Sequence, residues 1–262
     1  MELKEESKTL FIPLYGKALM SKECLFLKDK KAEEIINKVD YNFKKLKQSK
    51  WLSMYMALRA KKIDEICKNY IDKDLNLIVI HLGCGLDSRN LRIGQNVNWY
   101  DIDLKNVIDL RKEYYIESDK YKMIGKSVTD LTWLDDIEYT NQNVLVIAEG
   151  LTMYLLEEEI IHILEGMKNK FTNLNIVFDA YSKKAVKVSK YKNPVNQMNA
   201  TIKWGIDSKD EFLKLNKNLE FINEYKIEGK EEKLKGITKF IFEKLYCGKT
   251  SEKLYKIYEF KL

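Results

Sequence analysis

The 262-residue chain has only two prolines, 11 glycines and four cysteines. No Pro- or Gly-rich linker, repeat or low-complexity stretch interrupts it, so residues 1–262 are predicted to form one domain. No apolar run approaches the ~18 residues of a membrane helix. The first residues also lack the basic-then-apolar order of a signal peptide. We therefore expect a cytoplasmic protein without a membrane partner.

The cysteines are too scattered to organise a site: Cys24, Cys67, Cys84 and Cys247 form no C-x-x-C pair. This spacing argues against a zinc site and against a disulfide framework. Arginine is also scarce, because only four of the 46 basic residues are arginines, namely Arg59, Arg89, Arg92 and Arg111. A guanidinium binds an anion through two parallel hydrogen bonds, so we expect arginine where that geometry is needed.

Charge does not dominate the composition. Hydrophobic residues make up 45% of the chain, which is enough for a sizeable core and excludes a mainly disordered protein. The net charge of +6 is compatible with an anionic partner, but the lysines of residues 183–262 are interleaved with acidic and apolar residues. That pattern is typical of a solvated surface, so a nucleic-acid partner is not expected.

Hydrophobic periodicity predicts helices near the N-terminus and in the middle of the chain. Apolar residues recur there at steps of three and four, which places them on one helical face. The predicted helices cover 31–47, 51–71 and 157–171. Residues 1–72 are therefore expected to form a helical extension before the first strand.

Short apolar or β-rich runs alternate with helical patterns further along the chain. The predicted strands cover 77–82, 97–102, 144–148 and 174–180, and their continuous hydrophobicity is typical of buried strands. This alternation predicts an α/β core, residues 73–262, with a parallel sheet covered on both faces. Two later β-rich runs, 218–227 and 253–262, predict an antiparallel edge. In such sheets ligands bind at the carboxyl ends of the strands.

The first predicted strand ends in a glycine turn, HLGCGLDSR (81–89). Gly83 and Gly85 allow the backbone to turn sharply and to approach a ligand closely. A dinucleotide fingerprint would need a third glycine at position 88, where this chain has Ser88. A purely structural tight turn is the alternative interpretation.

Asp103 stands at the end of the next predicted strand, 18 residues after Gly85. A carboxylate at about this distance from the glycine turn can accept hydrogen bonds from both hydroxyls of a ribose. Asp101 would share its face of the strand, so either residue could be the ribose acceptor. Alternatively, Asp103 caps a helix that begins near Leu104.

Two further charged residues are predicted near this edge of the sheet. Arg59 falls on the apolar stripe of its helix, and a buried guanidinium requires an anion. A neighbouring acidic side chain or the carboxylate of a ligand would satisfy it equally well. Glu149 directly follows the strand at 144–148, so it would lie at the same edge as the glycine turn, unless it only caps the following helix.

A close-approach turn, a ribose-binding acid and a cation for a carboxylate fit a nucleoside joined to an amino acid. The chain has no GxxxxGK[ST] loop and no third glycine to cradle a pyrophosphate. S-adenosylmethionine (SAM) has a ribose and an amino-acid carboxylate but no phosphate. SAM is therefore the predicted cofactor, and no metal is expected.

The sequence resembles the leucine carboxyl methyltransferase family, most closely its bacterial branch of O-methyltransferases of polyketide biosynthesis, the tetracenomycin type. The similarity covers most of the chain, in the segments 9–22, 56–64, 81–89, 99–111, 127–136, 148–155 and 202–207. The resemblance implies a Rossmann-like SAM-dependent methyltransferase fold with a mainly parallel seven-stranded sheet, an N-terminal helical cap and an inserted lid near 181–207.

Carried over by position, the resemblance implies a cofactor site with eight residues. Gly83 and Gly85 would shape the loop, Asp103 would bind the ribose, and Ser127 and Val128 would flank the adenine. Glu149 would line the pocket near the methionine moiety, Arg59 would pair with the SAM carboxylate, and Lys17 stands where the family usually has arginine. Lys105 also departs from the family, which usually has proline there.

The predicted reaction is in-line transfer of a methyl group from SAM to a carboxylate or hydroxyl of a small molecule. A carboxylate acceptor needs no general base, whereas a hydroxyl does, and no base is assigned. His81 is interpreted as a core histidine, His162 as a surface residue, and Tyr154 as an assisting group or lid packing. The alternatives are an NAD(P)-dependent oxidoreductase and a SAM-binding protein without catalysis.

Overall fold

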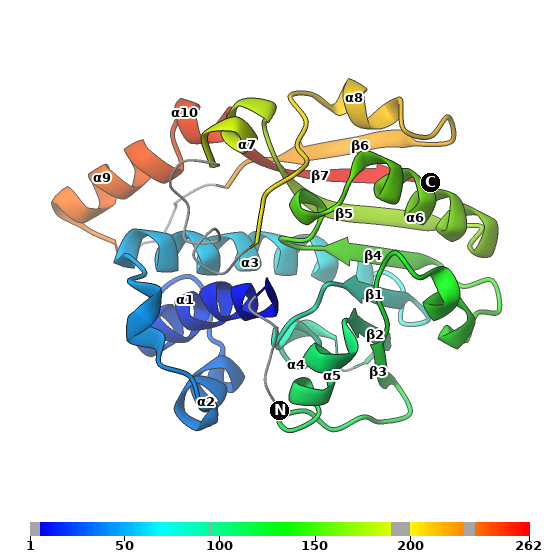
Figure 1. Ribbon diagram of the computed structural model, residues 1–262, viewed down its shortest axis with the longest axis horizontal. Helices are drawn as coiled ribbons and strands as arrows, with labels where there is room; N and C mark the ends of the chain where they lie inside the picture. The colour runs from blue at the N-terminus through cyan, green and yellow to red at the C-terminus, as the bar shows by residue number, and fades with distance from the viewer. Residues whose placement is uncertain (1–5, 95, 190–199, 228–233) are drawn as a thin grey trace.

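The computed structural model describes residues 6–94, 96–189, 200–227 and 234–262. Its centre is a seven-stranded sheet in the order β3-β2-β1-β4-β5-β7-β6 (Figure 1). The strands are β1 (Ile78–Leu82), β2 (Asn98–Asp103), β3 (Tyr121–Gly125), β4 (Val144–Ala148), β5 (Leu174–Tyr181), β6 (Glu220–Tyr225) and β7 (Tyr255–Lys261). Neighbouring strands are parallel except at β7, which is antiparallel to β5 and β6. The predicted sheet with its antiparallel C-terminal strand is confirmed.

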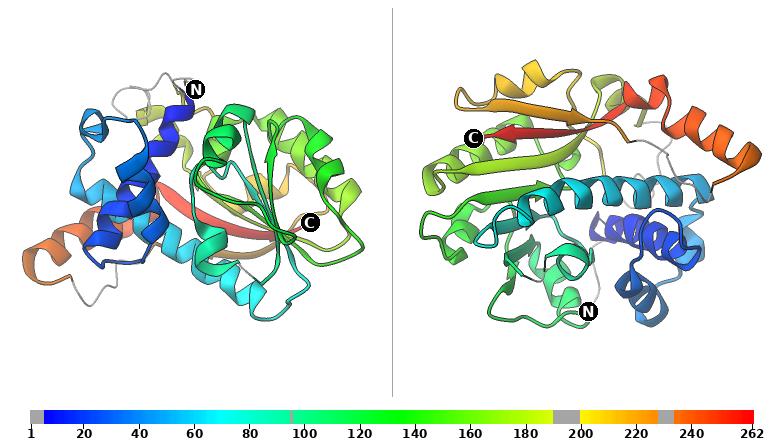
Figure 2. Two further views of the ribbon diagram at one scale, coloured as in Figure 1. Left: turned by 90° about the horizontal axis from the view of Figure 1, so that it is seen from below. Right: turned by 180° about the vertical axis from the view of Figure 1, so that it is seen from behind.

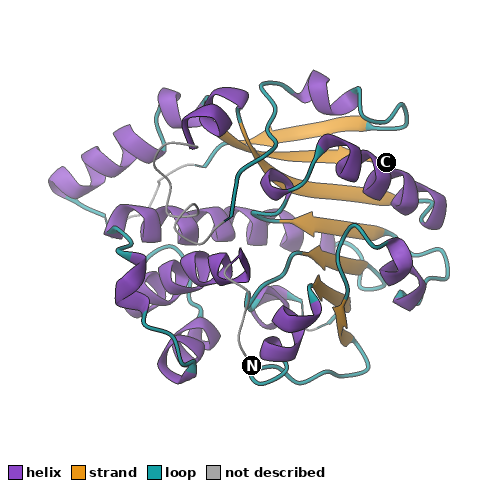
Figure 3. Cartoon of the chain, in the orientation of Figure 1, coloured by secondary structure: helices purple, strands orange, loops and turns teal. Residues whose placement is uncertain are grey.

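Helices cover both faces of the sheet (Figure 3). They are α1 (Phe11–Lys22), α2 (Lys30–Lys38), α3 (Lys50–Ile71), α4 (Arg89–Ile93), α5 (Lys105–Arg111), α6 (Glu157–Lys170), α7 (Lys183–Ser189), α8 (Lys209–Leu213), α9 (Gly236–Tyr246) and α10 (Lys249–Glu252). The helices predicted at 51–71 and 157–171 correspond to α3 and α6 and are confirmed. None of the described helices has the length and hydrophobicity needed to span a bilayer.

The helix predicted over 31–47 is wrong in its second half. α2 ends at Lys38 because Val39 adopts an extended conformation (φ −69°, ψ 134°). The side chain of Asn42 then caps a separate 3-10 turn, η2 (Phe43–Leu46). Asp and Asn side chains compete with helical hydrogen bonds, so the Asp40–Asn42 stretch favours a turn over a continuous helix.

The helix α3 connects the N-terminal helices with the sheet. Ser49 stabilises its start by accepting a hydrogen bond from the backbone N–H of Leu52. With 22 residues it extends over about 33 Å and packs against α1. Because this helix is sandwiched between α1 and the sheet, Arg59 near its middle is only 5% exposed.

Successive strand residues alternate between two hydrophobic clusters. Val79 and Val177 belong to a cluster with α1, α2 and α3, whereas Ile80 and Phe178 belong to a cluster with α6 and α8. The left view of Figure 2 shows the N-terminal helices on one side of the sheet and α6 on the other. We call these the α3 face and the α6 face.

The strand order reverses between β1 and β4. At such a switch point the connecting segments diverge, which leaves a crevice at the carboxyl ends of the strands. The start of the chain, with η1 (Glu6–Leu10) and α1, lies over this crevice and contributes to its lining.

Candidate active site

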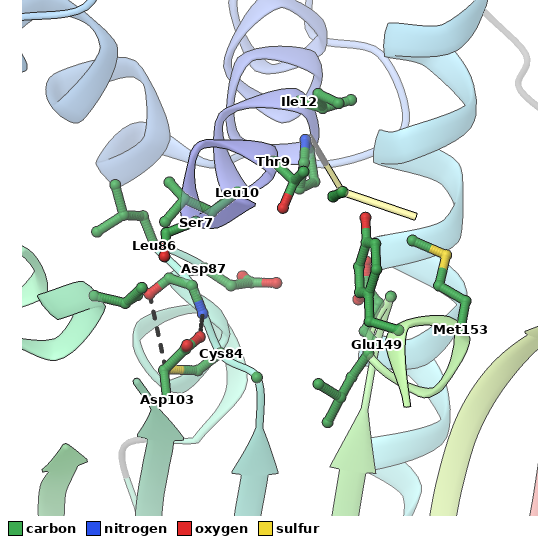
Figure 4. A pocket seen from close by; sticks show the side chains of 18 of the residues that line it. Ser7, Thr9, Leu10, Ile12, Cys84, Leu86, Asp87, Asp103, Glu149 and Met153 are labelled. Carbon is green, nitrogen blue, oxygen red and sulfur yellow. Dashed lines mark hydrogen bonds between the residues drawn. The ribbon is translucent and has the colours of Figure 1, made fainter. Parts of the chain in front are cut away.

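A cavity of about 600 Å³ opens at the carboxyl edge of β1, β2 and β4. This volume lies within the usual range for small-molecule sites, ~300–1,000 Å³. All eight residues predicted for the cofactor site line it: Lys17, Arg59, Gly83, Gly85, Asp103, Ser127, Val128 and Glu149. Figure 4 shows Asp103 and Glu149 entering from opposite sides, with Ser7, Thr9 and Ile12 above them. The topology thus brings together residues that are up to 132 positions apart.

The turn after β1 requires glycine at two positions. Gly83 (φ +66°) and Gly85 (φ +52°) both adopt left-handed conformations, which side chains disfavour. A Cβ on Gly83 would lie 3.0 Å from a methyl carbon of Leu151. Ser88, in place of a third glycine, donates a hydrogen bond of 2.6 Å to Asp29 at the start of α2. The loop is therefore fixed to the N-terminal helices.

Asp103 lies beneath this turn and lines the cavity. Its Oδ2 accepts a hydrogen bond of 2.7 Å from the backbone N–H of Gly85. Its Oδ1 accepts one of 2.7 Å from Leu104. Leu104, rather than Asp103, is the N-cap of α5, so Asp103 does not act as that helix cap. Burial raises the pKa of Asp103, and these backbone donors only partly offset the desolvation.

Asp101 has a different environment, although it shares the strand face of Asp103. It is fully buried, and its carboxylate forms an ion pair with Arg111. Trp99 and Tyr121 also donate hydrogen bonds to it, of 2.8 and 2.7 Å. Asp101 is not part of the cavity lining. Of the two acids that the sequence left open as ribose acceptors, only Asp103 faces the cavity.

Ser127 and Val128 follow β3 and line the same side of the cavity as Asp103. Val128 is 7% exposed. Its carbonyl accepts a hydrogen bond of 3.1 Å from the indole of Trp133. The Ser127 hydroxyl lies 2.8 Å from that of Thr129. These contacts hold Val128 and Ser127 in place, so that an apolar side chain and a hydroxyl lie next to each other in the cavity lining.

Arg59 pairs with acidic side chains, which is one of the two kinds of partner that its burial suggested. Its Nε donates a hydrogen bond of 2.8 Å to Glu149, and its Nη1 lies 3.2 Å from Asp179 and 3.0 Å from the Tyr255 hydroxyl. Its Nη2 has no hydrogen-bond partner among the described residues, and a Cβ on Gly150 would lie 3.4 Å from it. Arg59 also lines the cavity, so the ligand carboxylate, its other predicted partner, stays a prediction.

Glu149 is held as an anion between two arginines. Burial disfavours its charge, but Arg59 and Arg89 outweigh this and lower its pKa to about 2. Arg89 is fully buried and also donates a hydrogen bond of 2.6 Å to Asp64 on α3. A carboxylate with so low a pKa is a poor proton acceptor, which argues against Glu149 as a general base.

Lys17 is buried and paired with Asp87 at 2.8 Å. Asp87 also contacts Arg92 at 2.8 Å. Burial disfavours the charge of Asp87, but Arg92, Lys17 and Arg89 together hold its pKa well below the usual range. Lys17 is thus connected to the glycine turn through Asp87, and its charge, like that of Arg59, helps to lower the pKa of Glu149.

The sequence did not identify the acids that surround these cations. Asp64, Asp87 and Asp179 complete the ion pairs of the arginines. The scarcity of arginine was the usable signal, because every arginine forms ion pairs with its side chain at most 9% exposed. The sequence also offered a signal for Asp179, because this residue stands near the end of a predicted strand, as Asp103 does. Nothing local marks Tyr255.

The residues considered as general bases are poorly suited to that role. His81 is 2% exposed, lines the cavity floor, and lies 3.4 Å from both Asp101 and Arg89. His162 is exposed on α6, outside the cavity lining. Tyr154 lines the cavity, and burial raises the pKa of its hydroxyl. Among the described residues no group of three or more metal-ligating side chains is present.

The predicted lid near 181–207 is described only at its two ends, and 190–199 lie outside the described residues. Tyr181 lines the cavity from one end, and Ala200, Thr201 and Lys203 line it from the other. The backbone N–H of Lys203 donates a hydrogen bond of 2.7 Å to Met153. Both ends of this segment therefore adjoin the cavity.

Comparisons with known proteins agree with this geometry. Residues 2–168 match the leucine carboxyl methyltransferase family. The chain is also 35% identical to the tetracenomycin polyketide synthesis O-methyltransferase TcmP of Streptomyces glaucescens, over 76% of this chain and 74% of that protein. The chain belongs to the leucine carboxyl methyltransferase family.

Another relative of this methyltransferase is the S-adenosyl-L-methionine-dependent methyltransferase dpfgK of Gibberella zeae, which is 29% identical over 76% of this chain and 75% of that protein. The fold of the present chain is similar to that of magnesium protoporphyrin IX methyltransferase from Synechocystis PCC 6803, with a TM-score of 0.51. The sequence identity is 12%, and the match covers 88% of this chain and 93% of that chain. The predictions of a methyltransferase and of SAM as its cofactor are confirmed, and the NAD(P)-dependent oxidoreductase alternative is not supported.

The cavity of this methyltransferase suits SAM chemically. Asp103 offers carboxylate oxygens near a turn whose Cβ-free residues leave room for close approach. Arg59 offers an N–H group that no described residue uses. In the described part of the glycine turn, the Gly85 N–H that could face a pyrophosphate is already bonded to Asp103.

Proposed function

We propose that the protein transfers the methyl group of SAM to an oxygen atom of a small, largely apolar acceptor. The observation that carries this proposal is that Asp103 and Arg59 line one cavity, with Asp103 across from Glu149, the partner of Arg59 (Figure 4). Asp103 accepts hydrogen bonds from the ribose, and Val128 with Ser127 flanks the adenine. Arg59 Nη2 binds the amino-acid carboxylate, while Lys17 supports the turn through Asp87.

The acceptor lies on the side of the cavity away from Asp103. Met153 lies on that side beside Glu149 (Figure 4), and further apolar and aromatic side chains line the cavity: Ile12, Pro13, Leu52, Met56, Tyr154 and Tyr181. Lys203 lies among them with an exposed side chain that forms no ion pair with another described residue. An apolar acceptor with an anionic group matches this lining.

The charge state of the lining favours a carboxylate as the methyl-accepting group. SAM supplies the electrophilic methyl group, and the protein contributes orientation and electrostatics. Glu149 is unsuited to accept a proton, because its pKa is about 2. A carboxylate is already anionic at neutral pH and can attack directly, whereas a hydroxyl acceptor has to lose a proton.

We also propose a role for the segments that surround the site. The N-terminal helices of residues 1–72 would act as a cap on the core of residues 73–262, and the segment near 181–207 would act as a lid. Both contribute lining residues on the acceptor side, from Ile12 in α1 to Lys203. Acceptor specificity would therefore reside in these two segments.

Calorimetry with SAM tests the cofactor assignments. We expect Asp103→Ala and Arg59→Ala each to weaken SAM binding by roughly 1–3 kcal/mol, the usual value for a hydrogen bond to a charged group. Asp109→Ala on α5 is the matched control, because Asp109 pairs only with Lys105 in the described contacts. Unchanged affinity of Asp103→Ala would exclude the ribose assignment.

Methyl transfer from radiolabelled SAM to a panel of aromatic carboxylates and phenols tests the reaction. Methyl esters release methanol in mild alkali, whereas aryl methyl ethers are stable, so the volatile label identifies the bond that formed. We expect alkali-labile product with carboxylates. Alkali-stable product with phenols alone would support the hydroxyl acceptor instead, and no product with either would leave a SAM-binding protein without catalysis.

A further inference from the structure

We infer that Asp179 and Tyr255 form a positioning pair for Arg59, and that the C-terminal strand thereby completes the cofactor site. The inference rests on the proposed role of Arg59 at the amino-acid end of SAM. Tyr255 begins β7 and Asp179 lies near the end of β5. Neither residue lies within residues 2–168, which match the family.

The three side chains form a closed set of contacts. Arg59 Nη1 donates a hydrogen bond of 3.0 Å to the Tyr255 hydroxyl. That hydroxyl in turn donates a hydrogen bond to Asp179 Oδ2. The same carboxylate oxygen lies 3.2 Å from Arg59 Nη1. With Nε bound to Glu149 at 2.8 Å, two edges of the planar guanidinium are fixed, and the orientation of Nη2 follows from them.

The ring of Tyr255 is itself held between two tyrosines. Tyr55 on α3 makes an edge contact with it at 5.7 Å, and Tyr181 on β5 makes another at 4.8 Å. Tyr255 and Tyr181 are also direct partners in the antiparallel register of β5 and β7. The hydroxyl therefore has little freedom to follow Arg59 if the arginine moves.

Asp179 also couples this pair to the cavity wall. Its Oδ1 accepts a hydrogen bond of 2.7 Å from the backbone N–H of Gly150, and Gly150 lines the cavity beside Arg59. Asp179 therefore links the orientation of the Arg59 guanidinium to the backbone of the cavity wall.

The test compares two ligands that differ only at the amino-acid end. S-adenosylhomocysteine carries the carboxylate, whereas 5′-methylthioadenosine keeps the adenosine and sulfur but lacks it. We expect Tyr255→Phe to weaken S-adenosylhomocysteine binding about tenfold, as expected for a perturbed hydrogen bond to a charged group, and to leave methylthioadenosine binding unchanged. Calorimetry measures both affinities, and thermal melts verify folding.

Tyr258→Phe is the matched control. Tyr258 lies on the same strand, on the α6 face, and its hydroxyl makes no hydrogen bond to another described residue. It should bind both ligands as the wild type does. Asp179→Asn is a second variant, and it should show the same ligand-selective loss as Tyr255→Phe.

The outcomes separate this inference from the proposed function. The positioning role would be overturned if Tyr255→Phe bound S-adenosylhomocysteine as the wild type does, or if it lost the same affinity for both ligands. This holds even if Arg59→Ala weakened the binding of S-adenosylhomocysteine but not that of methylthioadenosine. If Arg59→Ala itself showed no selective loss, the carboxylate assignment in the proposed function would fail first. Additive losses in a Tyr255→Phe, Arg59→Ala double variant would also contradict a role through Arg59.

Discussion

The two faces of the sheet have opposite chemistry. On the α6 face, buried strand side chains such as Ile80, Val146 and Phe178 form a purely hydrophobic cluster with α6 and α8. On the α3 face, the strands carry buried ionisable residues: His81, Asp101 and Asp179 toward the carboxyl ends of the parallel strands, and Glu259 on the antiparallel β7. The glycine turn and Glu149 adjoin this second face. One sheet thus separates a packing surface from a functional surface.

The difference follows from the period of two in a strand, because successive residues point to opposite faces. A buried charge is tolerated only with a partner, and α3 and its neighbours provide the arginines on one face only. The comparison indicates that substitutions on the α3 face should affect both stability and binding, whereas substitutions of strand residues on the α6 face should affect stability alone.

The largest effect is expected for Arg89→Met. Arg89 is fully buried and pairs with Asp64 and Glu149, so its loss removes one of the two arginines that pair with each of these carboxylates, leaving Arg92 on Asp64 and Arg59 on Glu149. We expect the free energy of unfolding to fall by about 3–5 kcal/mol, as is typical when one partner of a buried ion pair is removed. Urea denaturation at pH 7 measures it. A loss below about 1 kcal/mol would show that packing alone stabilises this face.

Glu149→Gln should have a somewhat smaller effect that depends on pH. The pKa of Glu149 falls from 4.5 to about 2 on folding, which corresponds to about 3 kcal/mol of stability at neutral pH. Because the folded-state pKa is lowered, this contribution is fully present above pH 4.5 and is lost as the pH falls toward 2. Urea denaturation of the wild type and of Glu149→Gln at several pH values should show that the difference between their free energies of unfolding narrows below pH 4.5. A difference that does not change with pH would contradict the ion-pair explanation.

On the α6 face, Ile176→Val removes one buried methylene from a side chain that is 4% exposed. We expect a loss of about 0.5–1.5 kcal/mol in the free energy of unfolding. Affinity for S-adenosylhomocysteine should equal that of the wild type, as measured by calorimetry. A change in affinity would remove the distinction between the two faces.

The smallest effect is expected for Lys105→Ala. Lys105 is 77% exposed and pairs with Asp109 at 2.9 Å one helical turn later. Exposed pairs of this kind contribute about 0.3–0.5 kcal/mol, so the free energy of unfolding should change by no more than about that amount. Repeating the denaturation at high salt should abolish even this difference, since exposed charges are screened.

Local pattern was sufficient for most of the elements and for the position of the site. The apolar runs became β1, β2, β4 and β5, and the glycine turn and Asp103 lie at one edge because parallel strands share a direction. The error at 31–47 arose because Asp40 and Asn42 interrupt the helix. The prediction used only the spacing of apolar residues and took no account of these helix-disfavouring side chains. The roles of the eight lining residues in cofactor binding remain predictions.

The sequence by itself determined which residues are apolar, where the chain turns at Gly83 and Gly85, and that Arg59 on its apolar stripe needed an anion. Tertiary structure alone decided which anions Arg59 received, that Asp101 points into an ion pair while Asp103 faces the cavity, and that Tyr255 contacts Arg59. The physical reason is range. Periodicity reports on neighbours within a few residues, whereas Arg59 and Tyr255 are 196 positions apart and meet only through the order and register of the strands.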